Sequence, residues 1–143
     1  MTEKPGSNLQ ETLMRIEAEK RQLEALVSQS RVIESAIVEL ANTIELLEQL
    51  KKTPNGTEIL APIGGECFVK ATLKDNSSVL VGIGAKVSVE KNVDEAVKIL
   101  KDKSDELSKT LVKARENCVA INDHIEEMGE TAQKMFQEAQ SKK

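Results

Sequence analysis

Residue types that commonly carry chemistry are scarce in this chain. It has a single histidine, His124, and two cysteines, Cys67 and Cys118. A catalytic or metal site needs a nucleophile, a base or further ligands beside such a residue, and neither cysteine belongs to a cluster with metal-ligand spacing. We therefore expect His124 to face solvent. We expect both cysteines to be free thiols, with Cys118 in a helix seam, because the chain has the features of a protein from a reducing compartment.

Two glycine clusters resemble loops that bind phosphate. They are Gly64-Gly65 and Gly82-Ile83-Gly84, and Lys86 follows the second. A phosphate loop requires a strand before it and a helix N-terminus after it, with a third glycine or a Gly-Lys-Ser/Thr ending. Here a strand pattern follows Gly84, and Lys86 is followed by Val87. The glycines are interpreted as turn residues, and we expect no enzyme activity, no cofactor and no metal.

Charge and composition narrow the range of functions further. The 143 residues include 24 acidic and 20 basic side chains, which gives a net charge of −4, and the two signs interleave along the chain. A nucleic-acid-binding protein would cluster Lys and Arg on one face. No long uncharged stretch is available to span a membrane, and residues 1–8 lack the apolar region of a signal peptide. The sequence therefore predicts a cytoplasmic protein that binds neither nucleic acid nor membrane.

Two long segments repeat apolar residues at alternating steps of four and three. The second segment keeps this spacing from Val93 to Ala139, with Ser104 as its one polar interruption, and the first follows it more loosely from Leu9 to Leu47. Such spacing keeps one narrow stripe facing a partner helix, as in a left-handed coiled coil. Because a block that cannot be helical separates the two segments, the chain is predicted to fold back on itself as an antiparallel two-helix coiled coil.

The ends of the first helix are predicted from capping and breaking residues. Ser7 with Gln10 fits a capping box, and Asn8 is an alternative N-cap. Thr53-Pro54-Asn55-Gly56 should stop the helix after Lys52, because proline cannot continue the hydrogen-bond ladder and Asn-Gly favours a turn.

The middle block is predicted to form two consecutive β-hairpins. β-branched runs with a period of two are separated by glycine-containing turns and by Asp75-Asn76-Ser77, and Asn92 with Glu95 then makes a second capping box. The predicted fold class is α+β. We expect one domain over residues 1–143, with an N-terminal coiled-coil helix at 8–52, two hairpins at 57–91 and a C-terminal coiled-coil helix at 92–141.

Two surfaces of this predicted fold lack an obvious cover. Short hairpins are only marginally stable in water and have unpaired strand edges. Because the apolar stripes of both helices are expected to pack against each other, no helix is left to cover the strands. Strand pairing between chains is therefore expected. The alternative is a self-capped hairpin region on a monomer. The residues expected to serve assembly are Ile59, Ile63, Phe68, Val79, Val81, Val87 and Val89.

The second surface is the tip, where the two chain ends should meet. Some apolar residues there lie outside the stripe, while polar Thr12 and Glu19 occupy expected stripe positions. The two helices should therefore pack poorly at the tip. Methionine-rich surface of this kind adapts to many partners. The alternative is ordinary fraying, with scattered apolar residues that have no role. The residues expected to bind clients are Leu9, Leu13, Met14, Ile16, Met128, Met135 and Phe136.

The order of helix, two hairpins and helix resembles the α class of prefoldin subunits, particularly the archaeal form. The residues that carry the resemblance are the run 58–71, Lys74-Asp75, Val79, the run 81–85, the run 87–91 and Asp94-Glu95-Ala96. Two hairpins are typical of the α class, whereas the β class has one. The sequence departs from the family pattern at Ala61, where valine is usual, and at Gly65-Glu66-Cys67, which replaces a turn of small residues.

This resemblance implies an assembly and an activity. It implies a hexamer of two α and four β subunits, in which the strands form an intersubunit β-barrel and coiled-coil arms hold non-native proteins at their tips without ATP. It also implies transfer of these client proteins to a group II chaperonin. A structural coiled-coil adaptor, and a prefoldin-like subunit of another complex, are the alternative interpretations.

Overall fold

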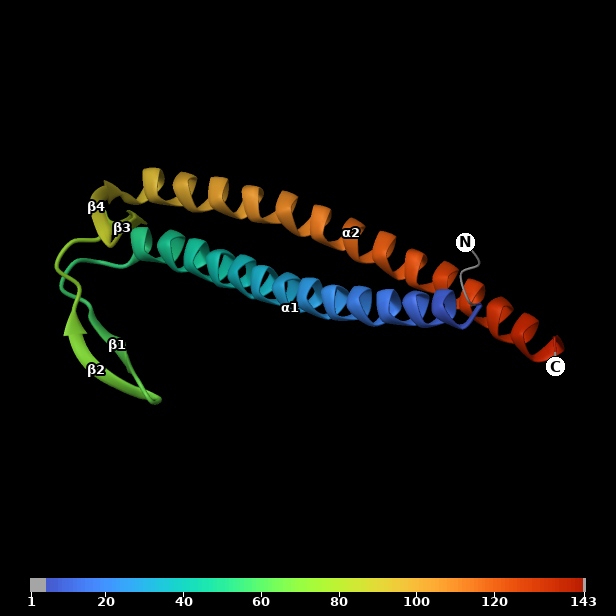
Figure 1. Ribbon diagram of the computed structural model, residues 1–143. Coiled ribbons are helices and arrows are strands. Elements are labelled where there is room, and N and C mark those ends of the chain that lie inside the picture. Colours follow the sequence, from blue (N-terminus) through green and yellow to red (C-terminus); the bar gives the residue numbers. More distant parts are fainter. Residues whose placement is uncertain (1–4, 143) are drawn as a thin grey trace. The chain divides into compact units, whose positions relative to one another are not determined.

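The computed structural model describes residues 5–142. Four strands lie between its two helices in the sequence. They form two separate antiparallel hairpins, β1 with β2 and β3 with β4 (Figure 1). This confirms the predicted fold class for the single chain, whereas the intersubunit barrel stays a prediction. The elements in chain order are α1 (Pro5–Lys52), β1 (Glu58–Gly64), β2 (Cys67–Thr72), β3 (Ser78–Gly84), β4 (Val87–Asn92) and α2 (Val93–Ser141).

The chain divides into two compact units. Of the described residues, 5–35 and 108–142 make up the first, which we call the terminal unit, and 36–107 make up the second, which we call the hairpin unit. Each unit contains a segment of both helices, so each is described by itself. The single domain expected over residues 1–143 stays a prediction.

Helix α1 begins earlier than its capping residues predicted. The helix already includes Pro5, so Ser7, Asn8 and Gln10 all lie inside it and cannot be its cap. Proline is well tolerated in the first helical turn, because its fixed φ suits the helix and its missing N–H would have no helical partner there. The predicted start at residue 8 was therefore wrong by three residues, whereas the end at Lys52 is confirmed.

Ion pairs show that the helices of the terminal unit run antiparallel. Glu19 of α1 meets His124 of α2, and Glu34, further along α1, meets Arg115, which is earlier in α2. Both pairs lie at the surface, with Glu19 half-buried, and surface pairs of this kind contribute on the order of 0–1 kcal/mol each. They indicate direction and register more than they stabilise the fold.

In each unit, the stability of the helix pair comes from a seam of buried and half-buried side chains. In α2, every predicted stripe position from Val93 to Met135 is buried or half-buried, and in α1 the stripe follows the same alternation of four and three residues. The predicted coiled-coil pattern is thus confirmed. The one buried polar side chain among the described residues is Ser30, whose hydroxyl donates to the Leu26 carbonyl at 2.8 Å.

In the hairpin unit, a short polar segment ties the strands to the end of α1. The Asn76 side chain donates to the Thr53 carbonyl, and its backbone N–H donates to the Asn55 side chain, both at 2.8 Å. Asp75 accepts hydrogen bonds from the hydroxyl and the backbone N–H of Ser77 at 2.6 and 2.9 Å, and these bonds lower the pKa of Asp75. The predicted turn at residues 75–77 is confirmed, and it also anchors the link between the hairpins.

Strand β4 passes directly into α2. Asn92 is the last residue of β4, and its side-chain oxygen accepts the Glu95 N–H at 2.8 Å, which confirms the predicted N-cap. At the same end of the unit, Lys51 of α1 bonds the Asp94 carboxylate, and this bond is the main cause of the raised pKa of Lys51.

Candidate functional site: exposed apolar surfaces of the hairpins and the terminal unit

The hairpin of β1 and β2 exposes one entirely apolar face. Its cross-strand pairs Ile59–Ala71 and Ala61–Val69 share that face, because directly opposite residues of an antiparallel pair project to the same side. Ile59 is 38% exposed and Val69 47% exposed. Ala61 and Ala71 are half-buried, whereas Ile59 and Val69 remain accessible on this face to another chain.

The opposite face of this hairpin is mixed. Leu60 pairs with Lys70, and Pro62 pairs with Phe68. Leu60 and Phe68 are 63% and 59% exposed, so large apolar groups meet water on both sides of the same two strands. An isolated two-stranded hairpin is marginally stable at best, and a partner on either face would stabilise it.

One face of the hairpin of β3 and β4 is covered within its own chain. The Lys103 ammonium of α2 donates to the Gly82 carbonyl at 3.1 Å, which places β3 beside the first turns of α2. Val81 is only 7% exposed, and Ala96 of α2 is fully buried although it lies beside the stripe. Val79 and Val89 are half-buried. The expectation that no helix covers the strands was therefore wrong for this hairpin.

Both hairpins end in the same way. The strand register shifts between Pro62 and Gly64 in one hairpin and between Gly82 and Gly84 in the other, so a single isoleucine bulges out of each ladder. Those isoleucines, Ile63 and Ile83, are 66% and 56% exposed. The bulges place equivalent apolar side chains at the two turns.

The turns that follow these bulges have backbone conformations that favour glycine. Gly65 and Glu66 both have positive φ, at 56° and 60°, and so do Ala85 and Lys86, at 49° and 60°. Two consecutive residues at positive φ are typical of the two-residue turns whose twist matches paired strands. Three of these four positions carry side chains, which costs about 1 kcal/mol or more each.

The seven residues expected to serve assembly thus fall into two groups. Ile59, Ile63, Phe68 and Val87 are exposed, whereas Val79, Val81 and Val89 are buried or half-buried within the chain. The sequence interpretation omitted four exposed strand residues. They are Leu60, Val69, Leu80 and Ile83. Cross-strand pairing identifies such residues only when the strand register is known.

The terminal unit exposes a second apolar surface. Leu13 and Met14 of α1 are 49% and 69% exposed, and Phe136 of α2 is 53% exposed. Leu13, Met14 and Ala18 line a shallow hollow of about 500 Å³, with Gln10, Glu17 and Arg21 at its sides. Among the other residues expected to bind clients, Leu9, Met128 and Met135 are half-buried, and Ile16 is buried in the seam. A client could contact Ile16 only if the helices separated.

Polar side chains at the seam of this unit have partners. The Thr12 hydroxyl donates to the Asn8 carbonyl at 2.9 Å, and His124 Nδ1 lies 2.8 Å from both carboxylate oxygens of Glu19. Because a carboxylate accepts hydrogen bonds, this ring nitrogen carries the proton. The expectation that Glu19 leaves the tip poorly closed therefore needs correction: His124 bridges the two helices there.

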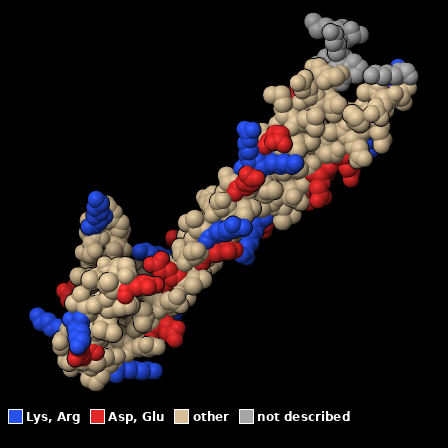
Figure 2. Space-filling view, turned by 90° about the horizontal axis from the view of Figure 1, so that it is seen from below, with Lys and Arg blue, Asp and Glu red and all other residues tan. Residues whose placement is uncertain are grey.

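Across residues 5–142 no group of His, Cys, Asp and Glu side chains is arranged to hold a metal ion. Neither described helix is long and apolar enough to cross a membrane. Cys67 and Cys118 are free thiols. On the face shown in Figure 2, basic and acidic side chains are interspersed over the helices, and they form no large basic patch there.

Comparison with known proteins relates these surfaces to a family. The prefoldin subunit model matches residues 8–138. This chain belongs to the prefoldin family. Its curated relatives include prefoldin α subunits from three archaea: Methanopyrus kandleri (40% identity, 59% of this chain and 54% of that protein), Methanococcus vannielii (33%, 73% and 70%) and Methanocorpusculum labreanum (36%, 76% and 78%).

Solved structures of prefoldins share the fold. The filamentous PFD of Methanocaldococcus jannaschii superposes with a TM-score of 0.71 at 23% identity, covering 80% of this chain and 95% of that one. The prefoldin β subunit of Thermococcus strain KS-1 superposes with a TM-score of 0.54 at 19% identity, covering 89% and 90%.

Membership of the prefoldin family identifies the role as that of a molecular chaperone subunit. The α-subunit relatives confirm the resemblance seen in the hairpin residues, and they favour this role over a structural adaptor. The prefoldin family is not an enzyme family.

Proposed function

We propose that this chain is the α subunit of a cytoplasmic hexamer of two α and four β subunits. The β1–β2 hairpin supports this assembly, because Ile59 and Val69 remain accessible on its apolar face. Strand edges and apolar faces of this kind favour pairing with another chain. The barrel proposed at the centre of the hexamer would bury these side chains together with Ile63, Phe68 and Val87.

We further propose that the terminal unit holds non-native proteins without ATP and passes them to a group II chaperonin. The observation that carries this proposal is the exposure of Leu13, Met14 and Phe136, the exposed large apolar side chains of α1 and α2 that lie nearest the ends of the described chain. Several weak apolar sites tethered in one complex gain affinity from avidity, so no single site must bind tightly. Weak individual contacts would also allow release without a nucleotide.

The experiment compares the assembled complex with one that carries Leu13→Ser and Phe136→Ser. Light scattering follows the aggregation of a chemically denatured client during dilution. The double variant should suppress aggregation several-fold less well, because each substitution removes about 1–2 kcal/mol of apolar contact. Val32→Ser is the matched control, since Val32 is 71% exposed on α1 of the same unit but lies outside the expected client surface.

Two results would contradict the proposal. One is equal suppression by the wild type and the Leu13/Phe136 variant while both complexes remain intact by sedimentation. The other is an equal loss in the Val32 control, which would show that the effect is not specific to the terminal apolar surface. A client-release assay with added chaperonin tests the transfer step, and we expect faster client refolding only when the complex and the chaperonin are both present.

A further inference from the structure

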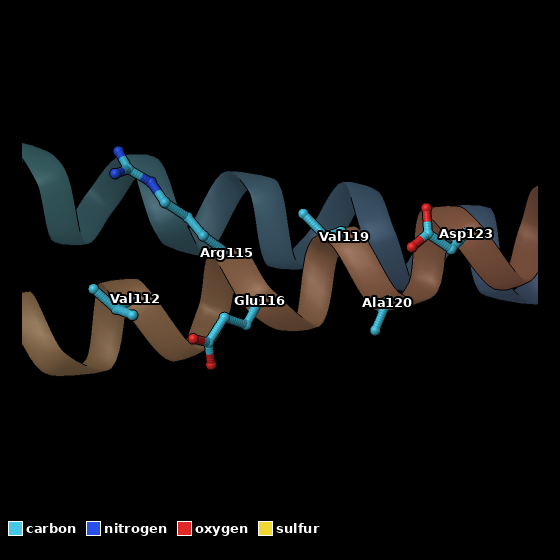
Figure 3. Close-up of a pocket in the computed structure, with 6 residues that line it drawn as sticks. All are labelled: Val112, Arg115, Glu116, Val119, Ala120 and Asp123. Atoms are coloured by element: carbon cyan, nitrogen blue, oxygen red, sulfur yellow. The ribbon is translucent and has the colours of Figure 1, made fainter.

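Helix α2 carries a shallow groove in the terminal unit, and none of its lining residues is among those expected to bind clients (Figure 3). Its volume is about 480 Å³. Val112 and Val119 are 54% and 61% exposed there. The lining residues follow helical steps of three and four, so they share one face of α2; they are Val112, Arg115, Glu116, Val119, Ala120 and Asp123.

The charges around this groove are unbalanced. Arg115, its single lining cation, extends toward α1 in Figure 3, and its guanidinium is paired with Glu34. Glu116 and Asp123 have no ion pair or hydrogen bond to any described residue. The groove therefore combines exposed valines with two carboxylates that have no partner in the chain.

We propose that this groove binds extended client segments in which apolar residues are interspersed with Lys or Arg. The proposal rests on the client-holding function proposed above and specifies the class of client. Residues 112 to 123 span about 16 Å along the helix. About five residues of extended chain cover that distance. Such a segment can place apolar side chains on the valines and basic side chains beside Glu116 and Asp123.

Charge complementarity selects this occupant over others. A neutral or acidic segment would desolvate the two carboxylates without compensation, which is unfavourable. A second copy of this chain that presented the same groove would place carboxylates against carboxylates, because the single cation that lines the groove is already paired with Glu34. A short, weak contact of this size adds little alone, but it adds to avidity when the terminal surface holds the same client.

The test measures peptide binding to the complex assembled with β subunits. Two fluorescein-labelled peptides of equal length are used, one alternating Leu with Lys and the other alternating Leu with Glu. Fluorescence anisotropy should show tighter binding of the Lys peptide by about fivefold or more at low salt, with the difference shrinking in high salt. Glu116→Gln with Asp123→Asn should remove most of that difference.

Substituting the valines tests the apolar part of the groove. Val112→Ser with Val119→Ser should weaken binding of both peptides by about three- to tenfold, which corresponds to loss of two partly buried valine side chains. Val32→Ser is again the control and should leave both affinities unchanged. Sedimentation of every variant checks that the complex keeps its size.

The outcomes distinguish the failure of each proposal. Unchanged peptide affinities in both groove variants would overturn the inference, and normal suppression of client aggregation by the same complexes would leave the proposed function standing. A change of complex size in the valine variant would make the groove a subunit contact and would also overturn the inference. If the wild-type complex neither suppresses aggregation nor binds either peptide, the proposed function fails and the inference fails with it.

Discussion

Replacing two apolar residues on the β1–β2 hairpin should weaken assembly without unfolding the helices. The variant carries Ile59→Ser and Val69→Ser, which lie on the apolar face and remain accessible there. Ile59 is 38% exposed and Val69 47% exposed, so a partner can bury at most those remaining fractions. Full burial of such a side chain is worth about 2 kcal/mol, and the two remaining fractions together are worth about 1.5–2 kcal/mol. Affinity for the β subunit should therefore fall by roughly 10- to 30-fold.

Sedimentation-velocity titration with the β subunit measures that affinity, and circular dichroism at 222 nm reports helix content. Helix content should remain unchanged, because both substitutions lie in strands. The control carries Val38→Ser with Leu46→Ser, which alters two α1 residues of the same unit that are 58% and 63% exposed. An affinity for the β subunit equal to that of the wild type, with intact helices, would refute the assignment of this face to assembly. An equal loss in the control would do the same.

Three further predictions concern stability. Ala85→Asn with Lys86→Gly should stabilise the β3–β4 hairpin by about 1 kcal/mol, because both positions have positive φ, and slower amide hydrogen exchange in β3 and β4 would show it; unchanged exchange would contradict the prediction. Glu19→Leu should raise the melting temperature of the complex, since it replaces a seam carboxylate with an apolar side chain. A lower melting temperature would show that the bond with His124 stabilises the complex more than an apolar side chain at this seam position does. The hydrogen bonds from Ser77 lower the pKa of Asp75, so they contribute stability that is present above the usual carboxyl pKa of about 4 and is lost as pH falls through the lower folded pKa. The NMR chemical shift of the Ser77 amide should therefore change only at a pH below about 4. An Asp75→Asn variant should abolish this acid-dependent change.

The helices could be predicted from the sequence because their signal is repeated many times. Each heptad of α2 repeats the same apolar stripe, so the helical pattern is still recognisable despite the one polar interruption at Ser104. The end of α1 depends on Pro54, whose fixed φ and missing N–H act locally, and on Gly56, which adopts a positive φ of 88° in the turn. Its beginning was placed too late, because Ser7 and Asn8 are good caps in general but a proline just before them extends the helix.

Burial of the strands was harder to predict because it depends on contacts that are distant in the sequence. Alternation along β3 shows that Val79 and Val81 share a face, but not that α2 covers this face. That cover becomes visible only through the bond from Lys103 to Gly82 and the burial of Ala96. The bridge from His124 to Glu19 joins residues more than a hundred positions apart, so neighbouring residues in the sequence gave no sign of it.

Native mass spectrometry of this chain, alone and mixed with a prefoldin β subunit, tests the central claim most directly. The account predicts that the chain alone gives unstable or mixed oligomers, and that the mixture converges on one species containing two copies of this chain and four β subunits. A stable monomer that does not bind the β subunit would contradict the account, because the exposed face of the β1–β2 hairpin would then need no partner.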